Sequence, residues 1–132
     1  MKGFLSALLL LSSVITQAQT INPAQARKYM GEIVTVCGEV SSAQSSKDVL
    51  QHPTLLGFGA SFPRNEFSVV ILEENLSGFS YNPIDLDKTN VCVTGTIVTI
   101  FGRPGIFVDD PSQIETANGS EINLTYHQDS GN

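Results

Sequence analysis

The chain has 132 residues, and its 13 Asp and Glu against seven Lys and Arg give a formal net charge of −6. This length fits one domain with a modest core. The acidic balance repels phosphate backbones at long range, so it excludes a general nucleic-acid coating protein.

The first 18 residues have the three-part layout of a secretory signal peptide. Lys2 supplies a positive charge, residues 4–15 are apolar apart from small Ser residues, and Thr16 and Ala18 are small residues at the −3 and −1 positions of a cleavage site. The apolar run is too short for a stable membrane anchor, and no cysteine follows it closely enough to be lipidated. A buried N-terminal helix is the alternative, which the polar residues from Gln17 onward disfavour.

We therefore predict three parts: a signal peptide over residues 1–18, a single domain over 19–115 and a flexible tail over 116–132, which is polar and lacks apolar periodicity. Loss of the leader removes Lys2, which leaves six Lys and Arg against 13 Asp and Glu, a formal charge of −7. We expect a periplasmic or secreted protein with no membrane anchor.

The first half of the domain predicts a short helix followed by strands. Asn22 and Pro23 are an N-cap and a first helical residue, which predicts one or two helical turns over residues 23–30. In the strand predicted over 32–40, Val34, Val36, Gly38 and Val40 share the inward face. A polar loop over 41–53, a short strand over 54–58 and a turn over 59–65 follow.

The second half predicts more strands. Residues 67–72 form the most apolar strand, and 73–81 have the weak periodicity of a short helix or a loop. Turn residues occupy 82–87. A long strand is predicted over 91–100, a turn over 101–105 and a last strand over 106–109.

Five strands with a short helix or loop between the third and the fourth predict an all-β fold, a five-stranded Greek-key barrel of the OB type with a short N-terminal helix. Gly38 and Gly95 fall in mid-strand on the inward face, where a small, strongly coiled barrel needs its strands to bend. A β-sandwich would need about seven strands.

Several strand and turn segments carry a resemblance to a known group of proteins. They are VTVCGEV, PTLLGFGASFP, FSVVI, VCVTGTI and GRPGIFVDDPSQI. Between Tyr29 and Ile114 the chain resembles small exported bacterial OB-fold proteins, which are described as nucleic-acid-binding-like. The resemblance implies the fold and no particular activity. Gly57 and Gly105 depart from the group, which tends to carry a polar side chain and an acid there, so ligand contacts through those side chains would be absent.

Cys37 and Cys92 are the two cysteines of the chain, and export would take them to a compartment where disulfides form. Both fall on the outward faces of strands that are antiparallel neighbours in an OB barrel. A register with Cys37 opposite Cys92 also places Gly38 opposite Val91. We therefore predict a structural disulfide. A redox-active pair lacks the C-x-x-C spacing, and a metal site lacks further ligands.

No catalytic constellation is evident, and we expect no enzyme activity, no cofactor and no metal. His52 and His127 are not near a nucleophile motif, and Asp85 and Asp87 lack the remaining residues of a calcium loop. An alternative is a metal-dependent nuclease-like OB enzyme, which Asp109 and Asp110 near Arg103 suggest. The two Asp residues followed by a proline are also typical of a strand end.

A binding module is better supported. OB folds bind ligands on the face of strands two and three and through the loops that join strands one to two and four to five. The candidate binding residues in or next to those loops are Lys47, Phe62, Arg64, Phe101 and Arg103. Aromatic rings that stack on bases and cations that meet phosphates are what single-strand binding needs.

We therefore predict an exported, non-enzymatic OB-fold binding module of the cell envelope. Its ligand is unidentified and could be an envelope protein, a glycan or another component. The alternative is weak binding of a single-stranded oligonucleotide through the same two loops. The acidic net charge of −6 for the whole chain disfavours nucleic acid.

Overall fold

The protein is described by a computed structural model that covers Gly3 and residues 18–116. Nearly all of the predicted signal peptide and of the predicted tail, including His127, falls outside the described residues. Within them, no helix is long and apolar enough to cross a membrane.

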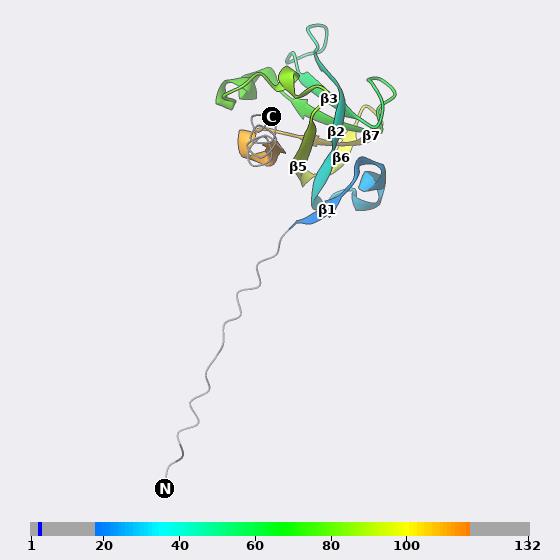
Figure 1. Ribbon diagram of the computed structural model, residues 1–132, viewed down its shortest axis with the longest axis vertical. Coiled ribbons are helices and arrows are strands. Elements are labelled where there is room, and N and C mark those ends of the chain that lie inside the picture. Colours follow the sequence, from blue (N-terminus) through cyan, green and yellow to red (C-terminus); the bar gives the residue numbers. More distant parts are fainter. Residues whose placement is uncertain (1–2, 4–17, 117–132) are drawn as a thin grey trace, which may run out of the picture.

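The described residues form one strongly curved sheet with short 3-10 helices around it (Figure 1). In chain order the elements are β1 (Gln19–Ile21), η1 (Pro23–Tyr29), β2 (Ile33–Ser45), β3 (Thr54–Phe58), β4 (Phe67–Ile71), η2 (Glu73–Gly78), η3 (Pro83–Leu86), β5 (Asn90–Thr96), β6 (Val98–Ile100), β7 (Arg103–Phe107), η4 (Pro111–Gln113) and β8 (Ile114–Thr116).

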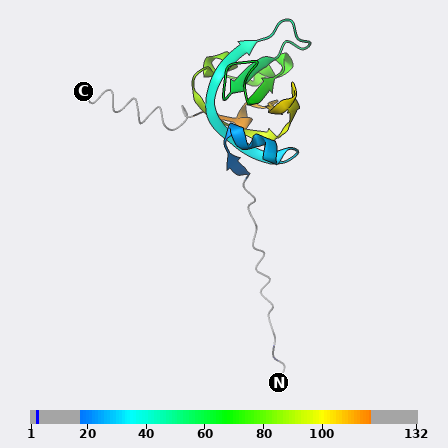
Figure 2. The ribbon, with the colours of Figure 1, turned by 90° about the vertical axis from the view of Figure 1, so that its right-hand side faces the viewer.

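The sheet closes into a barrel with the OB topology. The hydrogen-bonded strand order is β6-β7-β4-β3-β2-β5-β8, and β5 passes into β6 through the single residue Ile97. β4 and β7 are parallel, whereas β2 is antiparallel to both β3 and β5. Figure 2 shows the long β2 wrapping around the other strands. The predicted all-β barrel of the OB type is confirmed.

The inward faces follow the predicted alternation. Val34, Val36 and Val40 of β2 are at most 2% exposed, and Phe67, Val69 and Ile71 of β4 are fully buried. Together with the inward residues of β3, β5 and β7 they form the main core. A strand alternates between two faces, so this pattern was readable from the sequence.

The described part of the chain forms eight strands where five were predicted. The predicted strand over 91–100 is divided at Ile97 into β5 and β6. β1 pairs in parallel with β2, and β8 pairs with β5, with Thr116 opposite Val91. β1, β6 and β8 have only three residues each, and a three-residue segment shows too little alternation to be recognised in a sequence.

Two element boundaries also differ from the predictions. β2 continues to Ser45, through residues that were predicted as loop, because β3 pairs with them. The turn before β7 is only Phe101 and Gly102, with φ of 52° and 76°, and β7 therefore begins at Arg103. η2 lies within residues 73–81, which were predicted as a short helix or a loop, whereas η3 lies in the predicted turn over 82–87.

The short N-terminal helix was predicted correctly. The side chain of Asn22 accepts a hydrogen bond from the backbone nitrogen of Gln25, whose side chain accepts one from the backbone of Asn22, so the two form a capping box. Pro23 stands at the start of the helix. Ala26 is fully buried and fastens η1 to the barrel, while the basic Arg27 stays exposed.

Candidate ligand-binding site

The outer face of β3 and β4, which OB folds use for binding, is covered in this protein. The outward residues Leu55 and Val70 are 3% and 4% exposed, and Ser68 is 4% exposed. The loop over residues 59–66, called the cover loop below, joins β3 to β4 and folds back over this face. Its Phe62 packs on the small cluster formed by Leu55, Val70 and Ile100.

Hydrogen bonds hold the cover loop in this position. Asn65 is only 2% exposed, and its amide nitrogen donates to the carbonyl oxygen of Phe67 at 2.9 Å and to Oγ of Ser68 at 2.6 Å. The backbone nitrogen of Phe62 donates to Oγ of Ser42 at 3.0 Å. The covered face is therefore not open to a ligand while these bonds exist.

Arg103 fastens the cover loop from the side of β7. Its Nη1 donates to the carbonyl oxygen of Pro63 at 2.9 Å and to that of Asn65. Sequence reasoning assigned Arg103 to ligand binding. The structure shows that one guanidinium nitrogen is already used to hold the loop, while Nε and Nη2 remain as donors.

The two glycines that depart from the resembled group have a structural reason. A Cβ on Gly57 would lie 2.8 Å from Oγ of Ser42 and 3.2 Å from Cβ of Asn65, so a side chain there would push the cover loop away. A Cβ on Gly105 would lie 2.6 Å from the carbonyl oxygen of Ser68, across the parallel pairing of β4 and β7. Both glycines allow close packing on the outer face.

Phe62 and Phe101 meet at the end of the barrel where the cover loop and the β6–β7 turn lie side by side. Their ring centroids are 6.0 Å apart in an edge-to-face arrangement. Phe101 is 60% exposed, and Arg64 of the cover loop is also exposed. We call Phe62, Arg64 and Phe101 the aromatic tip. The structure thus brings together four of the five predicted binding residues, counting Arg103 beside the tip.

Lys47, the fifth predicted residue, is not at the aromatic tip. It lies in the loop that enters β3 at Thr54, whereas the cover loop leaves β3 at Phe58, so the two loops are at opposite ends of that strand (Figure 1). Sequence reasoning grouped the loops because OB folds use both. The length of the covered face separates them here.

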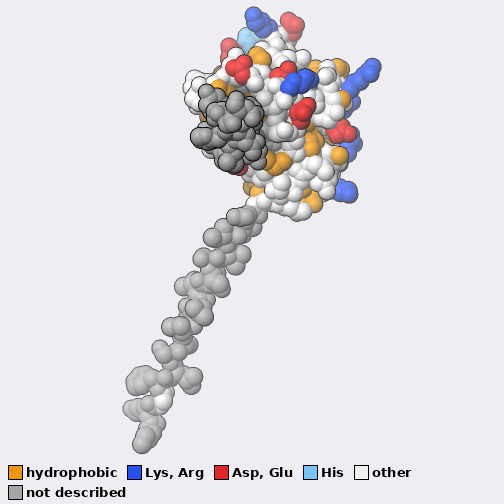
Figure 3. Space-filling view, in the orientation of Figure 1, with side chains coloured by type: hydrophobic (Ala, Val, Ile, Leu, Met, Phe, Trp, Pro, Cys, Tyr) orange, Lys and Arg blue, Asp and Glu red, His pale blue; other side chains and the backbone are white. Residues whose placement is uncertain are grey.

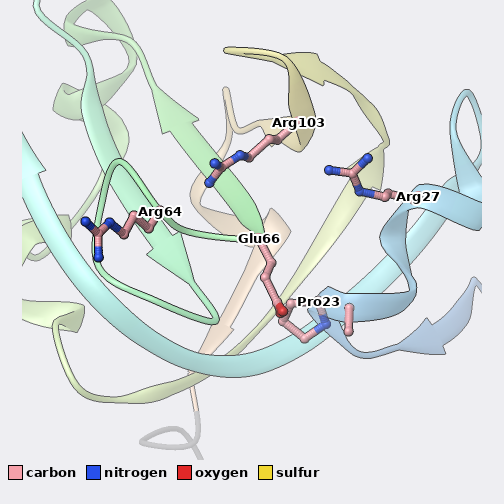
Figure 4. Close-up of a pocket in the computed structure, with 6 residues that line it drawn as sticks. Pro23, Arg27, Arg64, Glu66 and Arg103 are labelled. Atoms are coloured by element: carbon pink, nitrogen blue, oxygen red, sulfur yellow. The ribbon is translucent and has the colours of Figure 1, made fainter.

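A groove lies between η1, the cover loop and the start of β7. Its volume is about 280 Å³ and its lining residues are Pro23, Ala24, Arg27, Arg64, Glu66 and Arg103. We call it the arginine groove (Figure 4). Arg27 and Glu66 were not among the predicted site residues. Nothing local in the sequence marks them, because the groove exists only once η1 packs beside β7. Figure 3 shows that basic and acidic side chains are intermixed over one face of the protein.

One local sequence signal was available for the tip. The pattern Phe-x-Arg occurs twice, as Phe62-Pro63-Arg64 and as Phe101-Gly102-Arg103. Each copy stands in a connection that ends at the same end of the barrel. The recurrence of an aromatic ring next to a guanidinium group indicates a shared surface, and the structure brings the two rings into contact.

The predicted cysteine register is confirmed. Cys37 pairs directly with Cys92 between β2 and β5, Gly38 lies opposite Val91, and Gly95 lies opposite Val34. The two sulfur atoms are bonded at 2.07 Å, with both residues half-buried on the outer side of the barrel. The disulfide fastens the two strands that close the barrel.

The other residues considered for chemistry are dispersed. His52 Nδ1 lies 2.9 Å from Oε2 of Glu73, an exposed contact that joins the loop before β3 to η2. Arg103 begins β7 and Asp109 follows its other end, so they are not neighbours in a nuclease-like site. Asp110 caps η4. The described residues contain no group of three or more His, Cys, Asp or Glu placed to hold a metal ion.

Two side chains of the described residues, Tyr81 and Asp110, have shifted pKa values. The hydrogen bonds from Ser112 lower the pKa of Asp110, in keeping with its role as the N-cap of η4. Burial raises the pKa of Tyr81, whose hydroxyl is buried and has no hydrogen-bond partner among the described residues. Tyr81 packs edge to face on Phe79 and contacts the core. Neither group lines the arginine groove.

The fold and the surface define an OB-type barrel with a covered strand face and an exposed aromatic tip. No family model matches the chain, and no curated protein matches it. A solved structure described as an aspartyl-tRNA synthetase from Leishmania major Friedlin is similar at 12% identity and a TM-score of 0.45, over 80% of this chain and 22% of that one. The chain thus spans about a fifth of that protein's chain. A likeness at this level indicates nothing about the ligand.

Proposed function

We propose that this protein is an exported, non-enzymatic OB-type binding module that acts in the cell envelope through its aromatic tip. The observation that carries the proposal is the exposed Phe101, 60% accessible, paired with Phe62 beside Arg64. The usual OB strand face is covered by the protein's own loop, whereas the tip beside that loop presents an exposed aromatic ring to a ligand.

Export is supported by the leader pattern over residues 1–18 and by the Cys37–Cys92 disulfide, because disulfides persist in oxidising compartments. A fusion of residues 1–18 to a reporter enzyme that is active only after export tests this part of the proposal. A reporter that remains inactive, while a known leader activates it, would contradict export.

The ligand is an envelope protein, a glycan or another envelope component. Binding is tested with a tip variant, Arg64→Ala/Phe101→Ala, and with a matched control, Lys47→Ala/Leu50→Ala, at the opposite end of β3. The control removes one cation and one exposed apolar side chain as well, since Leu50 is 88% exposed. Purified envelope fractions should bind the mature protein and the control, and should bind the tip variant at least about tenfold more weakly. Equal binding to both variants would refute the proposal.

A single-stranded oligonucleotide is the second candidate, because the tip places aromatic rings beside a guanidinium group. A labelled mixed-sequence single strand is titrated at about 20 mM and about 150 mM salt, since release of counterions makes such binding strongly salt-dependent. Salt-sensitive binding that the tip variant loses would identify this ligand class. Absence of binding at the lower salt concentration would remove it and leave the envelope ligands.

A further inference from the structure

The arginine groove holds opposite charges that do not neutralise one another. Figure 4 shows the guanidinium group of Arg27 directed from η1 toward β7, the carboxylate of Glu66 directed toward Pro23, and Arg64 turned away from both. Among the described residues, the ion pair that forms joins His52 to Glu73, so Glu66 has no salt bridge with any arginine of the groove.

Each charge in the groove keeps unused hydrogen-bonding capacity. A guanidinium group has five N–H donors, and Arg103 uses Nη1 on two carbonyl oxygens of the cover loop. Its remaining donors and those of Arg27 can meet a carboxylate. The carboxylate of Glu66 can accept several hydrogen bonds, and Glu66 and Arg27 are both exposed.

We propose that the arginine groove binds a small zwitterion of the amino-acid or short-peptide class. The ligand carboxylate meets Arg27, and its ammonium group meets Glu66. The proposal rests on the proposed function in taking the protein to be a binding module, and it assigns a surface that adjoins the aromatic tip and shares Arg64 with it.

Charge and size both favour this class. The arginines of the groove attract an anion, but a simple anion would leave Glu66 without a partner, and the acidic chain, whose formal charge is −6 with the leader, opposes its approach. A simple cation would be repelled by the arginines. A zwitterion satisfies both signs at once. The volume of about 280 Å³ is slightly below that of pockets for drug-sized molecules, which suits an amino acid or a dipeptide.

The test uses three ligands that differ by one charge each: L-alanine, N-acetyl-L-alanine without the ammonium group, and L-alaninamide without the carboxylate. The dipeptide alanyl-alanine is added to test the length. Binding to the mature protein is followed by calorimetry and by backbone amide NMR shifts around Glu66 and Arg27. We expect L-alanine or the dipeptide to bind at least about tenfold more tightly than either single-charge analogue, because each loses one charge-assisted contact.

Variants separate the two halves of the site. Glu66→Gln should weaken zwitterion binding by about tenfold and strengthen binding of N-acetyl-L-alanine, since a repulsion is removed. Arg27→Gln should weaken both of these ligands. Glu32→Gln and Lys28→Gln are the matched controls, because both side chains are exposed near η1 and neither lines the groove. The controls should bind like the unmodified protein.

Three results would overturn the proposal. The first is equal binding of L-alanine and N-acetyl-L-alanine, which would indicate a simple anion site. The second is tighter binding of every ligand to the Glu66→Gln variant. The third is no binding of any of the four ligands at about 50 mM, a concentration well above a millimolar Kd. The tip variant Arg64→Ala/Phe101→Ala keeps Arg27 and Glu66, so its envelope-fraction test can still succeed or fail separately.

Discussion

Asn65 is expected to hold the cover loop on the barrel, and Asn65→Ala measures how strongly. Its side chain makes two buried hydrogen bonds, to the carbonyl oxygen of Phe67 and to Oγ of Ser68. Each bond contributes about 1 kcal/mol net, and a buried partner left unsatisfied costs about 1–3 kcal/mol. Since Ser68 is only 4% exposed, water does not easily replace the lost donor. We expect the free energy of unfolding to fall by about 2–4 kcal/mol.

The assay is unfolding by heat and by urea, followed by circular dichroism. For a domain of this size each 1 kcal/mol corresponds to about 4–8 °C, so the Tm should fall by about 8–32 °C. The backbone amide of Phe62 in the cover loop, which donates to Oγ of Ser42 in β2, should also exchange its hydrogen faster.

Two further variants check the reasoning. Asn90→Ala removes an exposed asparagine on β5 and should change stability by no more than about 0.5 kcal/mol. Asn65→Ala/Ser68→Ala removes the donor together with one partner, so it should recover about 1 kcal/mol relative to the sum of the single changes. A decrease in Tm of less than about 3 °C for Asn65→Ala, with native β4 amide shifts, would show that these bonds do not hold the loop.

Three other predictions concern the barrel. Gly105→Ala places a Cβ 2.6 Å from a backbone oxygen of β4 and should destabilise the protein by about 3 kcal/mol or more. Gly102→Ala, at a residue with φ of 76° and with nothing within 4 Å of the added Cβ, should cost about 1–2 kcal/mol. Urea titrations that rank the two variants the other way would contradict the packing argument. Tyr81→Phe removes an unpartnered buried hydroxyl and should leave the free energy of unfolding unchanged or raise it by about 1 kcal/mol. Burial raises the pKa of Tyr81 above 10.0, so the stability that depends on its neutral hydroxyl is present below that pH and is lost as the pH rises through the folded-state pKa. Urea unfolding at about pH 8 and about pH 11 should therefore show a decrease in the free energy of unfolding that the phenylalanine variant lacks. The oxidised mature protein should show no mass increase on alkylation without reductant. Reduction of the disulfide between Cys37 and Cys92, which are 55 residues apart, should lower the free energy of unfolding by about 4 kcal/mol. A protein that is alkylated without reductant and keeps its stability on reduction would contradict the disulfide.

The sequence by itself determined the features that depend on local pattern. Alternating valines identified the inward face of β2, and a directly opposed register between β2 and β5 followed from placing small residues across from large ones. Asn22 followed by Pro23 identified the start of η1. These features need only a strand period of two or a capping residue, both of which are properties of neighbouring residues.

Only the tertiary structure decided what the outer surface does. The sequence grouped Lys47 with the tip residues, because the loop that holds Lys47 and the loop that holds Phe101 are both binding loops in OB folds. It contained no sign that Asn65 would hold the cover loop over β3 and β4. It also did not indicate that Arg27 and Glu66 line one groove. Such contacts join segments that are far apart in the chain, and they depend on loop paths and packing directions that no local period encodes.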